Sequence, residues 1–344
     1  MTTPVKFGII GAGGIAQAYA QAFSQSEVAQ LVGVADVRPE AAKAMADKAG
    51  CASFSSYESM AENLDLDAVL ISTPPVTHRE ISIYFLNRQI NVLCEKPLSI
   101  SSEDAKAMRA VAQESGAILT MASKFRCVED VIKAKSIVDS GILGDIVLFE
   151  NAFTGRVDMS QRWNSNPEIS GGGVLMDNGT HSVDIMRYFL GPLAEVQVVE
   201  GKRIQGLPVE DTVKIFVKSC TGIMGNIDLS WSIQKELDYY IRLYGSEGTI
   251  SVGWKESKYR QASSSEWVVF GQGYNKIQAF QTQIDNFAKA IRGEEQLLIT
   301  ADDGVASVEA VEAAYQALEK SRWTAIANSA DLNGASTSAS VAVA

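Results

Sequence analysis

The chain has 344 residues, and at about 150 residues per domain this length predicts two domains. Hydrophobic residues make up 46% of the chain and charged residues 21%, which is ordinary globular usage and excludes a largely disordered or fibrous protein. The 30 basic and 41 acidic residues give a net charge of -11, so we expect neither nucleic acid nor an anionic membrane as a partner.

Hydropathy and cysteine spacing restrict the class further. No run approaches the roughly 18 apolar residues of a spanning helix, and the first residues carry no strongly basic region of a secretory signal. The four cysteines are scattered without the close spacing of a metal site; they are Cys51, Cys94, Cys127 and Cys220. We therefore expect a cytoplasmic chain with buried, reduced thiols and no bound metal.

Short apolar runs alternate with amphipathic stretches over the first 120 residues. Strands are predicted at 5–10, 31–35, 68–72, 91–94 and 117–122, with helical spacing between them, as at 41–49 and 80–87. Repeated strand–helix–strand units predict an α/β fold with a doubly wound parallel sheet and helices on both faces.

The pattern changes after residue 123. A helix is predicted at 124–140, followed by alternating strands near 145–153, 194–200, 212–218, 223–231 and 239–243 and by helices at 274–291 and 301–321. This favours a second domain with an open, mostly antiparallel sheet. We expect domains at 1–123 and 124–328, with the final helices free to pack back on the first domain, and a flexible tail at 329–344.

A glycine-rich loop directly follows the first predicted strand: Gly11-Ala12-Gly13-Gly14-Ile15-Ala16. The first glycine allows a tight turn, the second lets the backbone approach a pyrophosphate, and the third position must be small for helix–strand packing. The helix that follows would present its N-terminal amides to the phosphates. Such a loop alone is a weak signal.

An acid at the end of the second predicted strand strengthens the prediction. Asp36 stands 20 positions after Ala16, where a carboxylate can accept hydrogen bonds from both ribose hydroxyls of an adenosine. The negative charge favours NAD over NADP, although Arg38 can partly offset the repulsion of a 2′-phosphate. The alternative is a tight turn followed by a solvated carboxylate.

Two further turns follow predicted strands at their carboxyl ends, where ligands bind in doubly wound sheets. The first contains Thr73, Pro74 and His78, and the second is the tripeptide from Glu95 through Lys96 to a proline. Taken alone, each is an ordinary proline-fixed turn, and Lys96 is an ordinary solvated lysine.

A glycine run precedes the last candidate segment. Asp177, His181 and Asp184 are spaced i, i+4 and i+7, which is one face of a helix if the segment is helical. A carboxylate one turn from an imidazole can orient it and stabilise its protonated form, as a general base requires. The chain has only two histidines, yet a lone histidine on an amphipathic helix is more often structural.

Together these motifs resemble the Gfo/Idh/MocA family of nicotinamide-dependent sugar and polyol dehydrogenases over residues 5–325. The resemblance implies a Rossmann domain, a C-terminal α/β domain whose open sheet often forms the oligomer contact, and a homodimer or homotetramer. It implies a catalytic trio of Lys96, Asp177 and His181, with Asp184 in support. The residues it places near the cofactor are Gly11, Gly13, Gly14, Ile15, Ala16, Asp36, Arg38, Thr73, Pro74, His78, Glu95 and Lys96.

Substrate contacts are expected from the trio together with Arg126 and Trp163. The family often has a Trp-Arg pair before the glycine run, whereas this chain reads Trp163-Asn164; Arg156 and Arg162 lie nearby and can compensate, or they form a solvated loop. The segments 153–167 and 254–267 carry aromatic and basic side chains that can contact a ligand or simply cover the sheet.

The function expected is hydride transfer between a sugar or polyol carbon and NAD, with NADP as a possible substitute. Three alternatives stay open: a reductase, an oxidoreductase that keeps its nicotinamide bound while it shuttles between two sugars, and a non-catalytic dinucleotide sensor. A zinc hydrolase is disfavoured because two histidines and scattered cysteines provide no ligand set.

Overall fold

The computed structural model describes residues 3–327, which form two compact units. Unit 1 contains residues 3–129, 168–171 and 275–305, and unit 2 contains 130–167, 172–274 and 306–327. The tail predicted at 329–344 lies outside the described residues.

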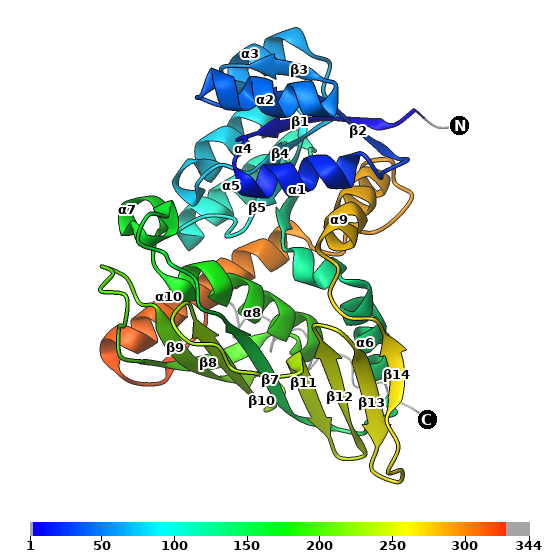
Figure 1. Cartoon of the computed structure of the whole chain (residues 1–344), viewed down its shortest axis with the longest axis vertical. Coiled ribbons are helices and arrows are strands. Elements are labelled where there is room, and N and C mark those ends of the chain that lie inside the picture. The colour runs from blue at the N-terminus through cyan, green and yellow to red at the C-terminus, as the bar shows by residue number, and fades with distance from the viewer. Residues whose placement is uncertain (1–2, 328–344) are drawn as a thin grey trace, which may run out of the picture. The chain divides into compact units, whose positions relative to one another are not determined.

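Unit 1 contains a parallel sheet with the strand order β3-β2-β1-β4-β5-β6 (Figure 1). Its strands are β1 (Val5–Ile10), β2 (Ala29–Ala35), β3 (Ala52–Phe54), β4 (Ala68–Ile71), β5 (Asn91–Glu95) and β6 (Leu119–Ala122). The order reverses between β1 and β4, and ligands of doubly wound sheets bind beyond the carboxyl ends of strands at such a point. The predicted doubly wound fold is confirmed. The three-residue β3 is too short for its pattern to predict.

Helices pack around this sheet. They are α1 (Gly14–Phe23), α2 (Pro39–Ala49), α3 (Tyr57–Asn63), α4 (His78–Leu86), α5 (Ser102–Ser115) and α9 (Lys276–Ile291), with 3-10 turns η1 (Pro75–Thr77) and η2 (Lys124–Cys127). Helix α9 lies beside α1 (Figure 1), although it follows the second sheet in the chain. The Phe7 ring lies 5.1 Å from Phe23 and 6.0 Å from Phe287, so α9 completes the core of unit 1.

Unit 2 contains a nine-stranded sheet with the order β14-β13-β12-β11-β7-β10-β9-β8-β15. Its strands are β7 (Ile146–Thr154), β8 (Leu193–Glu200), β9 (Thr212–Ser219), β10 (Met224–Ser230), β11 (Tyr239–Gly245), β12 (Gly248–Gly253), β13 (Ser257–Gln261), β14 (Val268–Gly271) and β15 (Thr324–Ala325). Neighbours pair antiparallel, except for β7 and β10. This confirms the mostly antiparallel second sheet, and β13 lies within the segment 254–267.

Helix α8 (Val174–Leu190) packs on one face of this sheet, against β7, β9 and β10. Side chains along β9 alternate between the two faces of the sheet. Val213, Ile215 and Val217 are buried on the face that packs against α8, whereas Lys214 and Phe216 point to the opposite face. The remaining helices are α6 (Glu129–Asp139), α7 (Pro167–Ser170) and α10 (Ala301–Lys320), with a 3-10 turn η3 (Trp163–Ser165).

The single helix predicted at 124–140 is wrong in its first part. Residues 124–127 form the 3-10 turn η2, Val128 is extended, and α6 begins only at Glu129. The side chains of Phe125, Cys127 and Val128 are all buried, so tertiary packing of this segment overrides its local helical spacing. Cys51 and Cys220 are half-buried rather than fully buried as expected.

Candidate functional site

The glycine loop between β1 and α1 has the form that a pyrophosphate requires. Gly11 has φ +93, and an added Cβ there would lie 2.9 Å from the Ser72 carbonyl oxygen, so only glycine fits. Gly13 caps α1 without a side chain, and a Cβ built on Gly13 or Gly14 meets nothing within 4 Å. The space above the first amides of α1 is therefore accessible, while the fully buried Ala16 lets the helix pack closely on the sheet.

Asp36 joins the end of β2 to this loop. Its Oδ2 accepts a hydrogen bond from the Ala12 amide at 2.7 Å, and its Oδ1 accepts one from the Arg38 amide at 2.8 Å. The Arg38 Nε lies 3.2 Å from Oδ1 on a side chain that is 60% exposed. Burial raises the pKa of Asp36, but the hydrogen bonds from Arg38 and Ala12 outweigh it, so the pKa is lowered and the carboxylate stays charged.

The turns after β4 and β5 are tied together by His78. Its Nε2 lies 2.9 Å from the Thr73 carbonyl oxygen, and its Nδ1 lies 2.9 Å from the Pro97 carbonyl oxygen. The ring is fully buried, and burial lowers the pKa of His78 despite these carbonyl contacts. His78 therefore acts as a brace that holds Thr73 and Pro74 in a fixed relation to the turn that carries Lys96.

Glu95, the last residue of β5, is buried beneath that turn. Its Oε1 accepts a hydrogen bond from the Tyr19 hydroxyl at 2.7 Å, and its Oε2 accepts one from the Lys96 amide at 3.0 Å. Burial raises the pKa of Glu95, and the positive charge of Lys96 opposes the shift. The half-buried Lys96 thus lies at the carboxyl end of β5, and its backbone amide is held by Glu95.

Arg126, expected to contact substrate, lies in η2 and is 4% exposed. Its guanidinium lies 3.3 Å from Asp303 Oδ1 in the first turn of α10. Burial raises the pKa of Asp303, but Arg126 and Thr300 outweigh it and lower the pKa. Arg126 therefore fixes η2 against α10 within unit 1.

In unit 2, Asp177, His181 and Asp184 all lie in helix α8, so the segment is helical and their spacing places them on one helix face. Asp177 is half-buried near the start of the helix, and His181 is buried one turn later, with its ring 6.4 Å from Phe153 of β7 in an edge-on arrangement. Asp184 is fully buried, and the Ser307 hydroxyl lies 3.5 Å from its Oδ1. These positions fit an acid–base pair with a buried supporting carboxylate.

The segment between β7 and α8 carries the other expected substrate residues. Trp163 is 44% exposed in η3, and Arg156 and Arg162 are exposed on the same segment. Gln205 holds the residues that precede Trp163. Its Oε1 accepts a hydrogen bond from the Met159 amide and its Nε2 donates one to the Val157 carbonyl, both at 3.0 Å.

The sequence analysis did not identify three residues that support the predicted ones: Tyr19, Gln205 and Glu210. Tyr19 hydrogen-bonds to Glu95, Gln205 holds the Trp163 segment, and Glu210 bonds to the start of α8. Of the three, Glu210 could have been noticed from the sequence. It forms an adjacent acidic pair at 210–211 directly before a predicted strand, and acidic residues are depleted in strands.

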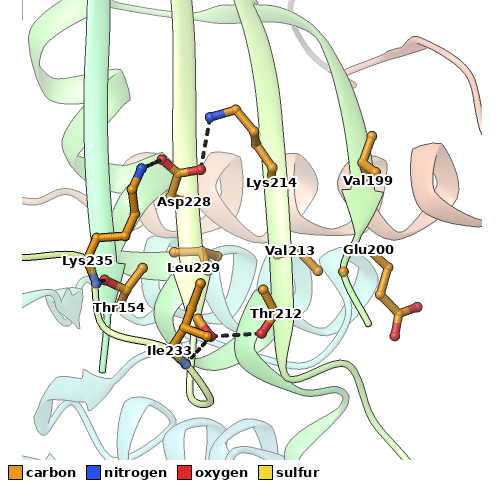
Figure 2. Close-up of a pocket in the computed structure, with 12 residues that line it drawn as sticks. Thr154, Val199, Glu200, Thr212, Val213, Lys214, Asp228, Leu229, Ile233 and Lys235 are labelled. Carbon is orange, nitrogen blue, oxygen red and sulfur yellow. Dashed lines mark hydrogen bonds and ion pairs between the residues drawn. The ribbon is translucent and has the colours of Figure 1, made fainter. Parts of the chain in front are cut away.

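A surface hollow of about 180 Å³ lies on the other face of the unit 2 sheet. Figure 2 shows Asp228 between Lys214 and Lys235, with Thr212 and Thr154 beside them. Burial raises the pKa of Asp228, but both lysines outweigh it and lower the pKa. Because Lys214 points away from α8, this hollow is separate from Asp177 and His181 and contains none of the predicted site residues.

Within residues 3–327, no helix is both long and apolar enough to cross a membrane, and no group of three or more His, Cys, Asp or Glu side chains is arranged to hold a metal ion.

Two family profiles match the chain. The profile described as an oxidoreductase family with an NAD-binding Rossmann fold matches residues 5–123, and the Gfo/Idh/MocA C-terminal domain matches residues 131–251. Inositol 2-dehydrogenase of Rhizobium meliloti is 26% identical over 343 residues, which is 94% of this chain and 99% of that protein.

Solved structures share the whole fold. Levoglucosan dehydrogenase in complex with NADH and levoglucosan superposes with a TM-score of 0.87 at 23% identity, over 94% of this chain and 99% of that one. Aldose-aldose oxidoreductase from Caulobacter crescentus, complexed with glycerol, gives a TM-score of 0.86 at 22% identity, over 94% and 100%.

Proposed function

Because the chain belongs to the Gfo/Idh/MocA family of NAD-binding oxidoreductases, we propose that it oxidises a secondary alcohol or hemiacetal carbon of a sugar or polyol. The observation that carries this proposal is the placement of Asp177 and His181 one turn apart on α8. The relative that is an inositol 2-dehydrogenase, similar over nearly its whole length, supports a polyhydroxylated substrate.

Unit 1 has the features that a nicotinamide dinucleotide needs. The loop at Gly11, Gly13 and Gly14 leaves the first amides of α1 accessible to a pyrophosphate, and Asp36 would accept hydrogen bonds from ribose hydroxyls. NAD is favoured over NADP because the pKa of Asp36 is lowered and its negative charge opposes a 2′-phosphate, although Arg38 reduces that opposition. When bound, the nicotinamide supplies a hydride acceptor.

The acid–base work falls to this chain's own side chains. His181 would remove the proton from the substrate hydroxyl, and Asp177 would orient the ring and stabilise its protonated form. Lys96 would stabilise the negative charge that develops on the same oxygen. Trp163 and the exposed Arg156 and Arg162 would contact the rest of the substrate, whereas the buried Arg126 would support the fold of η2.

The experiment measures reduced-nicotinamide formation by wild type and His181→Ala, with NAD and NADP separately, across aldoses, inositols, sugar acids and nucleotide sugars. We expect activity with one substrate class and a loss of about 10²–10⁴-fold in the variant. Wild-type turnover in His181→Ala would refute the assigned base.

If no substrate in the panel gives reduced nicotinamide although the protein binds the dinucleotide, one of the three alternative functions is favoured. Nicotinamide that survives dialysis and exchanges hydride between two sugars would identify the shuttling oxidoreductase. Oxidation of added NADH by a keto sugar would identify a reductase, and binding without either reaction would identify a sensor.

We also propose a homodimer or homotetramer formed through the sheet face opposite α8. Val199, Phe216 and Met224 lie on that face and are 52%, 38% and 56% exposed. Exposed apolar side chains gathered on one face favour association. Light scattering after gel filtration should give at least twice the 37.0 kDa chain mass, and Phe216→Glu should lower it.

A further inference from the structure

Two glycines at the start of α8 lie against other backbone and side-chain atoms. A Cβ on Gly173 would lie 2.1 Å from the Glu210 carbonyl oxygen and 2.9 Å from its carboxyl carbon. A Cβ on Gly172 would lie 1.8 Å from the Tyr315 hydroxyl. The glycine run is therefore needed for the close approach of Glu210 and Tyr315, in addition to any role in ligand binding.

Glu210 accepts hydrogen bonds from three consecutive amides at this helix end. Its Oε1 accepts from Gly173 and from Leu175, each at 3.0 Å, and its backbone carbonyl accepts from Val174 at 3.0 Å. Helix N-terminal amides have no partner within the helix, so a cap from outside decides where the helix begins. Gly173, which occupies the N-cap position, has no side chain to do this.

Tyr315 of α10 holds the Glu210 carboxylate in place. Its hydroxyl donates to Glu210 Oε1 at 2.8 Å and accepts from the Gly173 amide at 3.2 Å. Glu210 is 4% exposed, and burial raises its pKa while these hydrogen bonds oppose the shift. A negative charge at a helix N-terminus is also favoured by the helix dipole.

The cap acts on the helix turn that carries Asp177. The Asp177 amide donates to the Gly173 carbonyl at 3.0 Å, so Asp177 belongs to the first hydrogen-bonded turn, and His181 follows one turn later. A change in where that first turn begins would rotate or shift both side chains. Misplacement by about 1 Å can cost on the order of 100-fold in rate.

We infer that Glu210 is a positioning residue: its carboxylate, held by Tyr315, fixes the start of α8 and thereby the placement of Asp177 and His181. This inference rests on the proposed function. Glu210 acts through the backbone amides at the start of α8.

The kinetic test compares Glu210→Ala, Glu210→Gln and Tyr315→Phe with wild type below their melting temperatures. We expect Glu210→Ala to lower kcat by about 10–100-fold, with the Kd for NAD unchanged, because the dinucleotide residues lie in unit 1. Glu210→Gln keeps an oxygen acceptor and should recover most of the rate, and Tyr315→Phe should fall between. Asp139→Asn, which changes an exposed carboxylate at the end of α6, is the matched control and should keep wild-type kcat.

A second measurement needs no turnover. Because the chain has only two histidines, ring-labelled protein gives two histidine NMR signals, which a His181→Ala sample assigns. We expect Glu210→Ala to shift or broaden the His181 signal and to leave His78, in unit 1, unchanged. If no sugar is oxidised by wild type, the proposed function fails while this measurement still tests the positioning role.

The inference is overturned if folded Glu210→Ala keeps the wild-type His181 signal, or if it loses thermal stability while keeping wild-type kcat. Either result would make the cap a purely structural contact. If Glu210→Ala does not fold, Tyr315→Phe decides by the same two measurements.

Discussion

Tyr19 of α1 donates a hydrogen bond of 2.7 Å to Glu95 at the end of β5, and both side chains are buried. The contact joins the helix that follows the glycine loop to the turn that carries Lys96. Tyr19→Phe removes a donor from a buried carboxylate, so we expect the free energy of unfolding to fall by about 1–3 kcal/mol. Urea denaturation measures this change.

Tyr57→Phe is the matched control for that variant. The Tyr57 hydroxyl contacts an exposed carboxylate at 3.5 Å, a weak bond, and we expect a change below about 0.5 kcal/mol. Equal stability of Tyr19→Phe and wild type would contradict the importance of the buried bond.

Lys96→Met should lower kcat by about 10²–10⁴-fold, because it removes the positive charge assigned to the developing oxyanion. The Kd for NAD, measured by fluorescence titration, should change little. Lys43→Met, which removes an exposed lysine that pairs with its helix neighbour Asp47, should leave kcat unchanged. A Lys96→Met enzyme with wild-type kcat would remove this residue from the mechanism.

Asp36→Ala should raise the KM for NAD by about 10–100-fold, because a hydrogen bond to a charged group contributes about 1.5–3 kcal/mol. The KM for NADP should fall, since Arg38 then meets a 2′-phosphate without the competing carboxylate. Asp36→Asn keeps an acceptor for the Ala12 amide and separates cofactor binding from loop stability. An unchanged ratio of the two KM values would contradict the proposed ribose contact.

Gln205→Ala should raise the KM for the sugar more than it lowers kcat. The side chain holds the Met159 amide and the Val157 carbonyl, so its loss frees the segment that leads to Trp163 without touching α8. Steady-state kinetics with the substrate found in the panel measure the split. A fall in kcat at constant KM would place Gln205 with the acid–base residues instead.

The Arg126–Asp303 pair should make stability depend on acid pH. The folded-state pKa of Asp303 lies below its ordinary value of 3.8, so its stabilisation is complete above that value and is lost as the pH falls through the lower, folded-state pKa. The stability difference between wild type and Asp303→Asn should therefore be constant from pH 7 to about pH 5 and shrink below pH 4. Urea denaturation across this range measures it, and a difference that grows on acidification would contradict the sign.

Sequence patterns identified both sheets and most helices because the relevant signals are local. The turn at Gly11 requires a residue that tolerates φ +93, and the alternation in 212–218 records which side chains meet α8. The helix expected at 124–140 failed because tertiary burial of Phe125, Cys127 and Val128 overrides local helical spacing.

The sequence by itself determined the dinucleotide loop and the two candidate acid–base residues, since each is encoded within a few neighbouring positions. The order of these motifs along the chain determined the family. Only the tertiary structure decided what holds them. Glu210 lies 37 positions from Gly173, and Tyr315 lies 142 positions from it, so no local pattern could pair them. A buried carboxylate loses its contact with water, so it must accept hydrogen bonds from donors within the protein. Only folding brings those donors together from distant parts of the chain.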